Sequence, residues 1–139
     1  MTMAEVVDDV EQPVLVRVAN SALGVLKKRG PLQTLAREIG KNNELKGFRS
    51  TDPTEATFAA LIHSEVSEAF EEFRAGNGPS IIYFDPDKPD KPEGMAVEYA
   101  DVLIRVLDWF DYHDINPDVV VRLKMDYNAT REYLHGKQF

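Results

Sequence analysis

Two pairs of acidic residues have the spacing of a helical metal site. Glu65 and Glu68 lie three residues apart, and so do Glu98 and Asp101. Residues three apart in a helix project from one face, so each pair offers two carboxylates to the same neighbour. Oxygen ligands of this kind suit Mg²⁺, or Mn²⁺, better than softer metals. The spacing therefore predicts that these four carboxylates bind a divalent cation.

The first acidic pair falls within an amphipathic helix expected from about Pro53 to Ala75. Asp52 can cap that helix, and proline is favoured at its first position. At ~100° per residue, Glu65 falls in the middle of the apolar arc and Glu68 at its edge. Because burying a carboxylate is costly unless it is paired or binds a metal, this placement favours ligation or pairing over simple solvation.

The second acidic pair falls within a helix expected from about Glu93 to Tyr112, whose surface is mostly apolar. We expect this helix to be buried almost all round, with its narrow polar stripe facing a site or another helix. Asp108, two turns beyond Asp101, is a candidate extra ligand or a group that supports the ligands. Arg105 is the nearest cation, and an ion-pair network around it is the structural alternative to a metal site.

The rest of the chain predicts further helices. Residues 1–12 lack apolar periodicity and are expected to form a flexible acidic tail. Apolar residues then recur at helical spacing from Pro13 to about residue 29, and again from Leu32 to Gly47. Residues 76–94 are rich in glycine, proline and charged residues, which predicts a short irregular or hairpin loop.

A last helix is expected to begin at Asn116-Pro117. Along it, Lys124, Asn128 and Arg131 recur at helical spacing and form a cationic, amide-bearing face. The sequence thus predicts an all-α bundle of four to five helices in a single domain over 13–139. Since so short a chain leaves some apolar stripes without an internal partner, we expect a dimer or a dimer of dimers.

Composition narrows the classes of partner. The chain has 139 residues, no cysteine and a formal net charge of −8 at pH 7. Such acidity argues against binding to duplex nucleic acid, and the lack of cysteine excludes disulfides and thiolate metal sites. None of the three histidines has the Glu-x-x-His spacing of a di-iron site. No signal peptide or membrane-spanning segment is expected, so the sequence predicts a cytoplasmic protein without a membrane partner.

The order of these motifs resembles the MazG-type all-α nucleoside triphosphate pyrophosphohydrolases over about residues 31–139. The similarity rests on a Glu-x-x-Glu helix at 61–69 and a Glu-x-x-Asp helix at 97–108, the latter introduced by Lys91-Pro92-Glu93-Gly94. Residues 42–48 resemble a region that contributes to the nucleotide pocket of that family. Its tail is matched by Lys124-x-x-Tyr127-Asn128-x-x-Arg131 and by His135-Gly136-Lys137.

The resemblance implies Mg²⁺-dependent hydrolysis of an NTP or dNTP to the monophosphate and pyrophosphate, in nucleotide-pool house-cleaning. The four carboxylates would hold Mg²⁺, or Mn²⁺, and either Glu65 or Glu68 could act as the general base. Further contacts would come from Lys124, Asn128, Arg131 and Lys137 to phosphate, and from Asn42 and Phe48 to the nucleotide. A dedicated dUTP or phosphoribosyl-ATP pyrophosphatase is one alternative, and a non-catalytic helical assembly is another.

Overall fold

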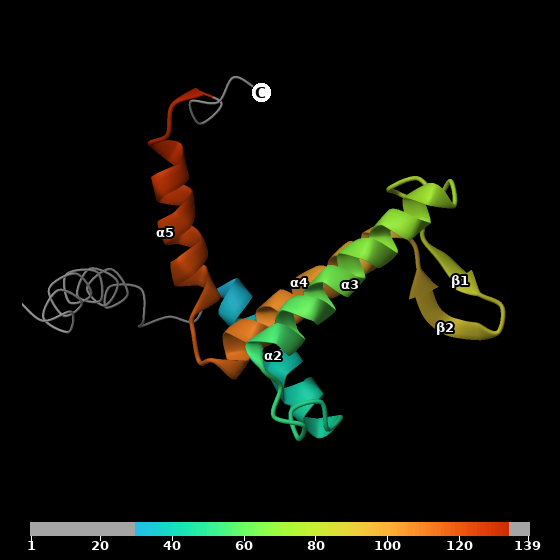
Figure 1. Ribbon diagram of the computed structural model, residues 1–139, viewed down its shortest axis with the longest axis horizontal. Helices are drawn as coiled ribbons and strands as arrows, with labels where there is room; N and C mark the ends of the chain where they lie inside the picture. Colours follow the sequence, from blue (N-terminus) through green and yellow to red (C-terminus); the bar gives the residue numbers. More distant parts are fainter. Residues whose placement is uncertain (1–29, 134–139) are drawn as a thin grey trace, which may run out of the picture. The chain divides into compact units, whose positions relative to one another are not determined.

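The computed structural model describes residues 30–133, which are mostly helical and include one small sheet. In order, the elements are α2 (Pro31–Leu45), α3 (Glu55–Arg74), β1 (Tyr83–Asp85), β2 (Lys88–Glu93), α4 (Met95–Tyr112) and α5 (Pro117–Ala129) (Figure 1). Residues 32–115 form one compact unit, and residues 116–133 belong to a second. The expected tail at 1–12 and helix at 13–29 lie outside the described residues, and a single domain over 13–139 stays a prediction.

Helices α3 and α4 lie side by side along most of their length and form the frame of the larger unit (Figure 1). The start of α3 differs from the expectation. Thr54 is its N-cap and exchanges hydrogen bonds with Thr57, which makes a capping box. The prediction that Asp52 caps this helix was wrong. Asp52 has φ +50° and accepts a hydrogen bond from the Tyr112 hydroxyl at 3.1 Å.

The expected loop at 76–94 contains an antiparallel hairpin that joins α3 to α4. Its strands pair Tyr83 with Glu93 and Phe84 with Pro92. The Tyr83 hydroxyl donates a hydrogen bond to Glu72 of α3 at 2.9 Å, so the hairpin is tied to the end of that helix. Strand β2 then leads through Gly94 directly into α4. The hairpin therefore holds the first turn of α4 against the last turns of α3.

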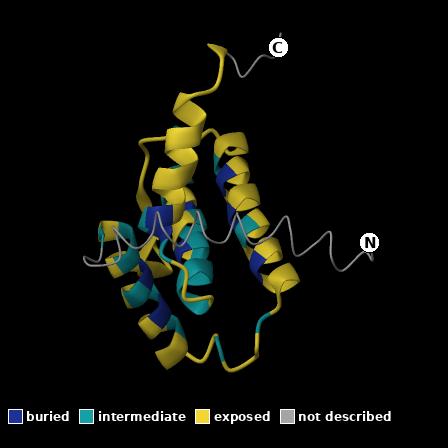
Figure 2. Cartoon of the chain, turned by 90° about the vertical axis from the view of Figure 1, so that its left-hand side faces the viewer, coloured by how far each residue is buried: buried dark blue, intermediate teal, exposed yellow. Residues whose placement is uncertain are grey.

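The prediction that α4 is buried almost all round was wrong for the single chain. Only Glu98 and Leu107 of this helix are buried, while Tyr99 is 56% exposed and Leu103 47%. In Figure 2, exposed residues cover most of α3 and α5, whereas most residues of α4 are intermediate between buried and exposed. The apolar pattern of α4 extends around most of the helix, but within the larger unit α3 packs against only one side of it. No helix among the described residues is long and apolar enough to cross a membrane.

Candidate metal centre

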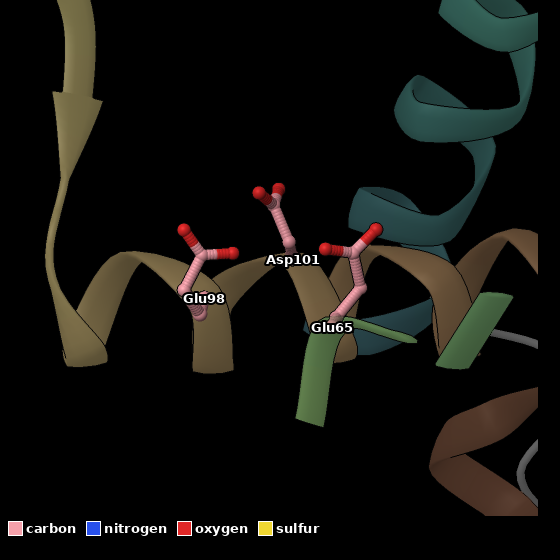
Figure 3. A group of neighbouring side chains, drawn as sticks. All are labelled: Glu65, Glu98 and Asp101. Carbon is pink, nitrogen blue, oxygen red and sulfur yellow. The ribbon is translucent and has the colours of Figure 1, made fainter. Parts of the chain in front are cut away.

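Three of the four predicted ligands meet between α3 and α4. Glu65 comes from the middle of α3, and Glu98 and Asp101 come from the first two turns of α4. One carboxylate oxygen from each residue lies within 4.8 Å of the others. Figure 3 shows the three side chains converging on one space. The i, i+3 spacing on α4 and the side-by-side packing of the two helices together produce this arrangement.

Glu98 is the most constrained of the three carboxylates. It is only 5% exposed, and among residues 30–133 it forms no side-chain hydrogen bond or ion pair. Burial raises the pKa of its carboxyl, and the charges of Glu68, Asp101 and Glu65 raise it further. A buried carboxylate without a cation is costly, so a cation that binds here would relieve both burial and repulsion.

Asp101 is half-buried at the edge of the cluster, and its carboxyl, like that of Glu98, has a raised pKa. Burial and the charge of Glu65 raise the pKa of its carboxyl, while the charges of Arg105 and Lys91 oppose that rise. Within the described part of the chain, Asp101 has no hydrogen-bonded cation of its own. The cluster therefore carries more negative charge than its neighbours balance.

Glu65 has a partner. Both Nε and an Nη nitrogen of Arg105 contact the same oxygen, Glu65 Oε1, each at 2.9 Å. The glutamate side chain is 10% exposed and the arginine 36%. Since both contacts use Oε1, the second oxygen of Glu65 remains available to a cation. The expectation that Arg105 adjoins the acidic site is confirmed by these contacts.

The spacing of the carboxylates fits a small hard cation after a modest contraction. Mg²⁺ binds oxygen at about 2.0–2.1 Å, so two ligands on opposite sides of the ion lie about 4.2 Å apart. The three oxygens here lie up to 4.8 Å apart. Like charges that face one another without an ion are expected to stand wider than in the bound state. A set of oxygens without nitrogen or sulfur favours Mg²⁺ or Mn²⁺.

Glu68 lies at the edge of the cluster rather than within it. Its side chain is exposed and accepts a 3.4 Å hydrogen bond from the Ser64 hydroxyl. Its charge nevertheless contributes to the raised pKa of Glu98, second to burial. The helical wheel already placed Glu68 at the rim of the apolar arc, and the structure agrees with that position. As the most accessible acid beside the site, Glu68 is suited to accept a proton.

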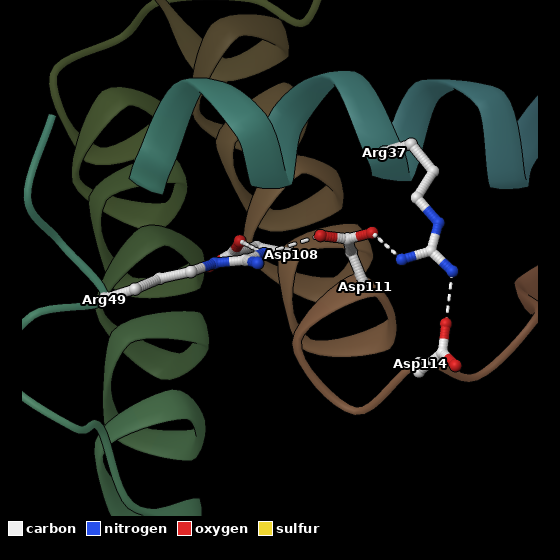
Figure 4. Close-up of polar contacts among 5 residues, drawn as sticks. All are labelled: Arg37, Arg49, Asp108, Asp111 and Asp114. Carbon is white, nitrogen blue, oxygen red and sulfur yellow. Dashed lines mark hydrogen bonds and ion pairs between the residues drawn. The ribbon is translucent and has the colours of Figure 1, made fainter. Parts of the chain in front are cut away.

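Asp108 belongs to a separate cluster. It accepts a hydrogen bond from Arg49 at 2.6 Å, and the same Arg49 nitrogen reaches Asp111 at 2.9 Å. Arg37 of α2 contacts the other oxygen of Asp111 at 2.9 Å and also pairs with Asp114 (Figure 4). Asp108 is therefore paired with an arginine instead of facing the three converging carboxylates. This charge cluster fastens α2 and the turn after it to the end of α4.

The predicted nucleotide contacts fall into three groups. Asn42 and Phe48 lie on α2 and on the turn after it, and both are exposed, with 61% of Phe48 accessible. Lys124, Asn128 and Arg131 are exposed residues of the second compact unit, on α5 and just after it. Lys137 lies outside the described residues. Contacts from all six residues to a nucleotide stay predictions.

Sequence reasoning missed Arg37, Arg49 and Lys91. The two arginines lie more than 55 residues before their aspartate partners, and no local spacing reveals such contacts. Lys91 had a signal, because it opens the Lys91-Pro92-Glu93-Gly94 motif that leads into the second acidic helix, although no role was assigned to it. A lysine placed by a strand at the start of that helix is within electrostatic reach of the helix's first carboxylates.

The chain matches no protein-family model, no curated protein and no solved structure.

Proposed function

We propose that this protein is a Mg²⁺-dependent nucleoside triphosphate pyrophosphohydrolase, which converts an NTP or dNTP to the monophosphate and pyrophosphate. The observation that carries the proposal is Glu98, a buried carboxylate without a cation partner among the described residues, facing Glu65 and Asp101. The paired Glu-x-x-Glu and Glu-x-x-Asp motifs, in that order, direct the choice toward nucleotide pyrophosphohydrolysis rather than other metal-dependent reactions.

Each residue of the cluster has a role in this proposal. Glu65, Glu98 and Asp101 would hold the cation, and Arg105 keeps the Glu65 carboxylate oriented. Mg²⁺ bound there supplies charge neutralisation for the phosphates and lowers the pKa of a water molecule. Glu68 accepts the proton of the water that attacks the α-phosphorus. It is preferred over Glu65 as the base because Glu65 is committed to Arg105, whereas Glu68 is exposed.

The acidity of the protein fits a metal-dependent substrate. At a net charge of −8 the chain repels free polyphosphate, so a substrate of this class requires positive charge at its binding site. The cation provides part of it. Lys124 and Arg131, with the amide of Asn128, are proposed to provide the rest. A dedicated dUTP or phosphoribosyl-ATP pyrophosphatase uses the same phosphate chemistry and differs in the base and sugar contacts.

One observation favours a second candidate, a non-catalytic helical assembly held by ion pairs. The contact between Arg105 and Glu65 is what that candidate requires. It does not account for Glu98 and Asp101, since neither has an ion pair among residues 30–133. The metal-dependent enzyme accounts for all three carboxylates and is preferred for that reason.

A panel of NTPs and dNTPs with Mg²⁺, scored for pyrophosphate against orthophosphate, tests the proposal. We expect the wild type to release pyrophosphate, with Mn²⁺ able to replace Mg²⁺ and Zn²⁺ a poor substitute. Glu98→Gln should lower kcat at least about 100-fold, because a cation ligand is lost. Glu71→Gln is the matched control, since Glu71 lies exposed on α3 and, among residues 30–133, its ion pair is with Arg74. It should leave kcat unchanged.

Two outcomes contradict the proposal. Turnover that persists after exhaustive chelation would show that the reaction does not depend on a metal. Release of orthophosphate alone, or of no product from any triphosphate, removes pyrophosphohydrolysis.

A further inference from the structure

Lys91 stands at the point where the hairpin enters the acidic helix. It lies on β2, and Figure 3 shows the strand that precedes α4 descending beside Glu98. The junction residue Gly94 has φ +126°, and a Cβ there would come within 2.3 Å of the Ile81 carbonyl oxygen. Only glycine allows this close contact, which fixes the strand on the start of the helix. Lys91 thus lies on the strand that leads into α4, seven residues before Glu98, and the charges of Glu98 and Glu68 act on it.

The charge of Lys91 acts on the cluster although its hydrogen bond goes elsewhere. Its ammonium lies 2.6 Å from Glu93 Oε1, and its side chain is 57% exposed. This hydrogen bond raises the pKa of Lys91, and the charges of Glu93, Glu98 and Glu68 add to the effect. At Asp101, where burial comes first and Glu65 second in raising the pKa, Lys91 joins Arg105 in lowering it. Arg105 is engaged with Glu65, whereas Lys91 is accessible to a ligand.

We infer that Lys91 is a phosphate-binding residue of the proposed site, which exchanges its ion pair with Glu93 for a polyphosphate oxygen. The inference rests on the proposed function and assigns to this lysine a substrate contact on the phosphate chain. The exchange is open to Lys91 because its side chain is 57% exposed, and it leaves Glu93, whose side chain is 17% exposed, without this partner. A lysine ammonium also keeps its charge while its flexible stem moves between partners.

This role predicts effects of opposite sign on two ligands. The positive charge of Lys91 repels a divalent cation that binds the carboxylates alone. The same charge attracts a polyphosphate that binds together with the cation. Removing it should therefore strengthen the binding of Mg²⁺ alone and weaken the binding of polyphosphate. A residue that only supported the hairpin would weaken both when removed.

Calorimetry on the full chain separates these cases, with Mg²⁺ alone and with inorganic triphosphate at saturating Mg²⁺ as the two probes. We expect Lys91→Ala to bind Mg²⁺ about threefold more tightly, from the loss of one nearby positive charge. The same variant should bind triphosphate about tenfold more weakly, from the loss of one charge-assisted hydrogen bond. Lys91→Arg should keep most of the triphosphate affinity. Lys88→Ala is the matched control on β2 and should change neither affinity, because within residues 30–133 Lys88 forms no ion pair.

The inference is overturned if Lys91→Ala leaves both affinities unchanged, if it weakens both, or if Lys88→Ala has the same effects. The proposed function is judged separately, by pyrophosphate release from nucleoside triphosphates. A wild type that binds Mg²⁺ and triphosphate with the expected Lys91 effects, yet releases no pyrophosphate, overturns the enzyme and leaves the phosphate contact in place. A wild type that binds neither probe overturns both.

Discussion

At the scale of single residues, Glu98 is a carboxylate that the fold holds in an unfavourable position. The residue is nearly fully buried, faces two other acids and has no ion pair in the described part of the chain. A glutamine of the same shape would fill the same space without the charge, so packing alone does not require an acid here. A buried carboxylate held in this position is what a metal ligand requires before a metal binds.

The raised pKa of Glu98 makes a prediction about stability and pH. In the folded protein, burial and the charges of Glu68, Asp101 and Glu65 favour the protonated form of this carboxyl above its ordinary pKa of 4.5. The folded state therefore takes up a proton before the unfolded state as pH falls. The contribution of Glu98 to the free energy of unfolding is lowest at neutral pH, rises as pH falls through the raised pKa, and is complete below the ordinary one.

Thermal and urea unfolding in chelator, from pH 7 to pH 4, measure this contribution as a difference between proteins. At pH 7, Glu98→Gln should be more stable than the wild type by on the order of 1 kcal/mol, because an unpaired buried charge is gone. The difference should shrink toward pH 4. Glu71→Gln is the control for the loss of one exposed carboxylate on α3. A variant less stable than the wild type at pH 7 contradicts the unpaired carboxylate.

At the scale of elements, local sequence predicted which face of a helix each acid occupies, whereas tertiary contacts determined the helix cap and the long-range partners. The angular positions of Glu65 and Glu68 on the helix followed from periodicity alone, and the first is buried while the second is exposed. The choice between Asp52 and Thr54 as N-cap did not follow, because both residues can cap and they flank the same proline. Only the tertiary fold separates them, since it directs Asp52 to Tyr112 of α4.

The partner of Asp108 shows the same limit over a longer distance. The sequence predicted that Asp108 lies on the polar face of α4. The position of a residue on a helix face does not show which neighbouring side chain it contacts. Arg49 lies in the turn after α2, 59 residues away, and reaches Asp108 only because that turn packs against the end of α4. Gly40 permits this approach, since a Cβ at that position would lie 1.8 Å from Asp111 Oδ2. No periodicity contains that information.

The pairing of Arg49 predicts how strongly the turn after α2 is held. Arg49, Asp108 and Asp111 have side chains that are 19%, 13% and 7% exposed. Breaking a buried pair from one side costs about 3 kcal/mol, so Arg49→Ala should lower the free energy of unfolding by about that amount. Arg74→Ala should cost less than about 0.5 kcal/mol, because its pair with Glu71 is exposed on both sides. Urea unfolding of the two variants measures the difference.

Equal costs for the two arginine variants would contradict this account of the cluster. Asp108→Asn in the Arg49→Ala background provides a further check. If the loss of Arg49 is costly because it leaves buried aspartates uncompensated, the second substitution should restore part of the stability. No restoration would mean that the arginine acts through packing, for instance through its position 5.6 Å from the Tyr112 ring centre.

At the scale of the whole molecule, the single chain exposes more apolar surface than an isolated helical unit requires. The larger unit alone leaves large side chains on α3 and α4 more than one-third exposed, among them Leu61, Phe70, Phe73, Tyr99, Leu103 and Ile104. Scattered exposed apolar residues are ordinary, but a concentration on two packed helices is typical of an interface. An interface on α4 would explain why its apolar pattern predicted burial that the larger unit does not supply.

Self-association is therefore the prediction that belongs to this scale. Sedimentation of the full chain should show a dimer or a tetramer at micromolar concentration, since obligate interfaces bury about 2,000 Å² or more of largely apolar surface. Leu103→Glu places a charge on the exposed apolar part of α4 and should weaken association at least about 100-fold. His63→Glu, at an exposed polar position of α3, is the matched control and should sediment as the wild type. A wild type that sediments as a monomer at high concentration would contradict the prediction. The apolar side chains of α3 and α4 would then be exposed in the monomer in solution, unless a different partner covers them.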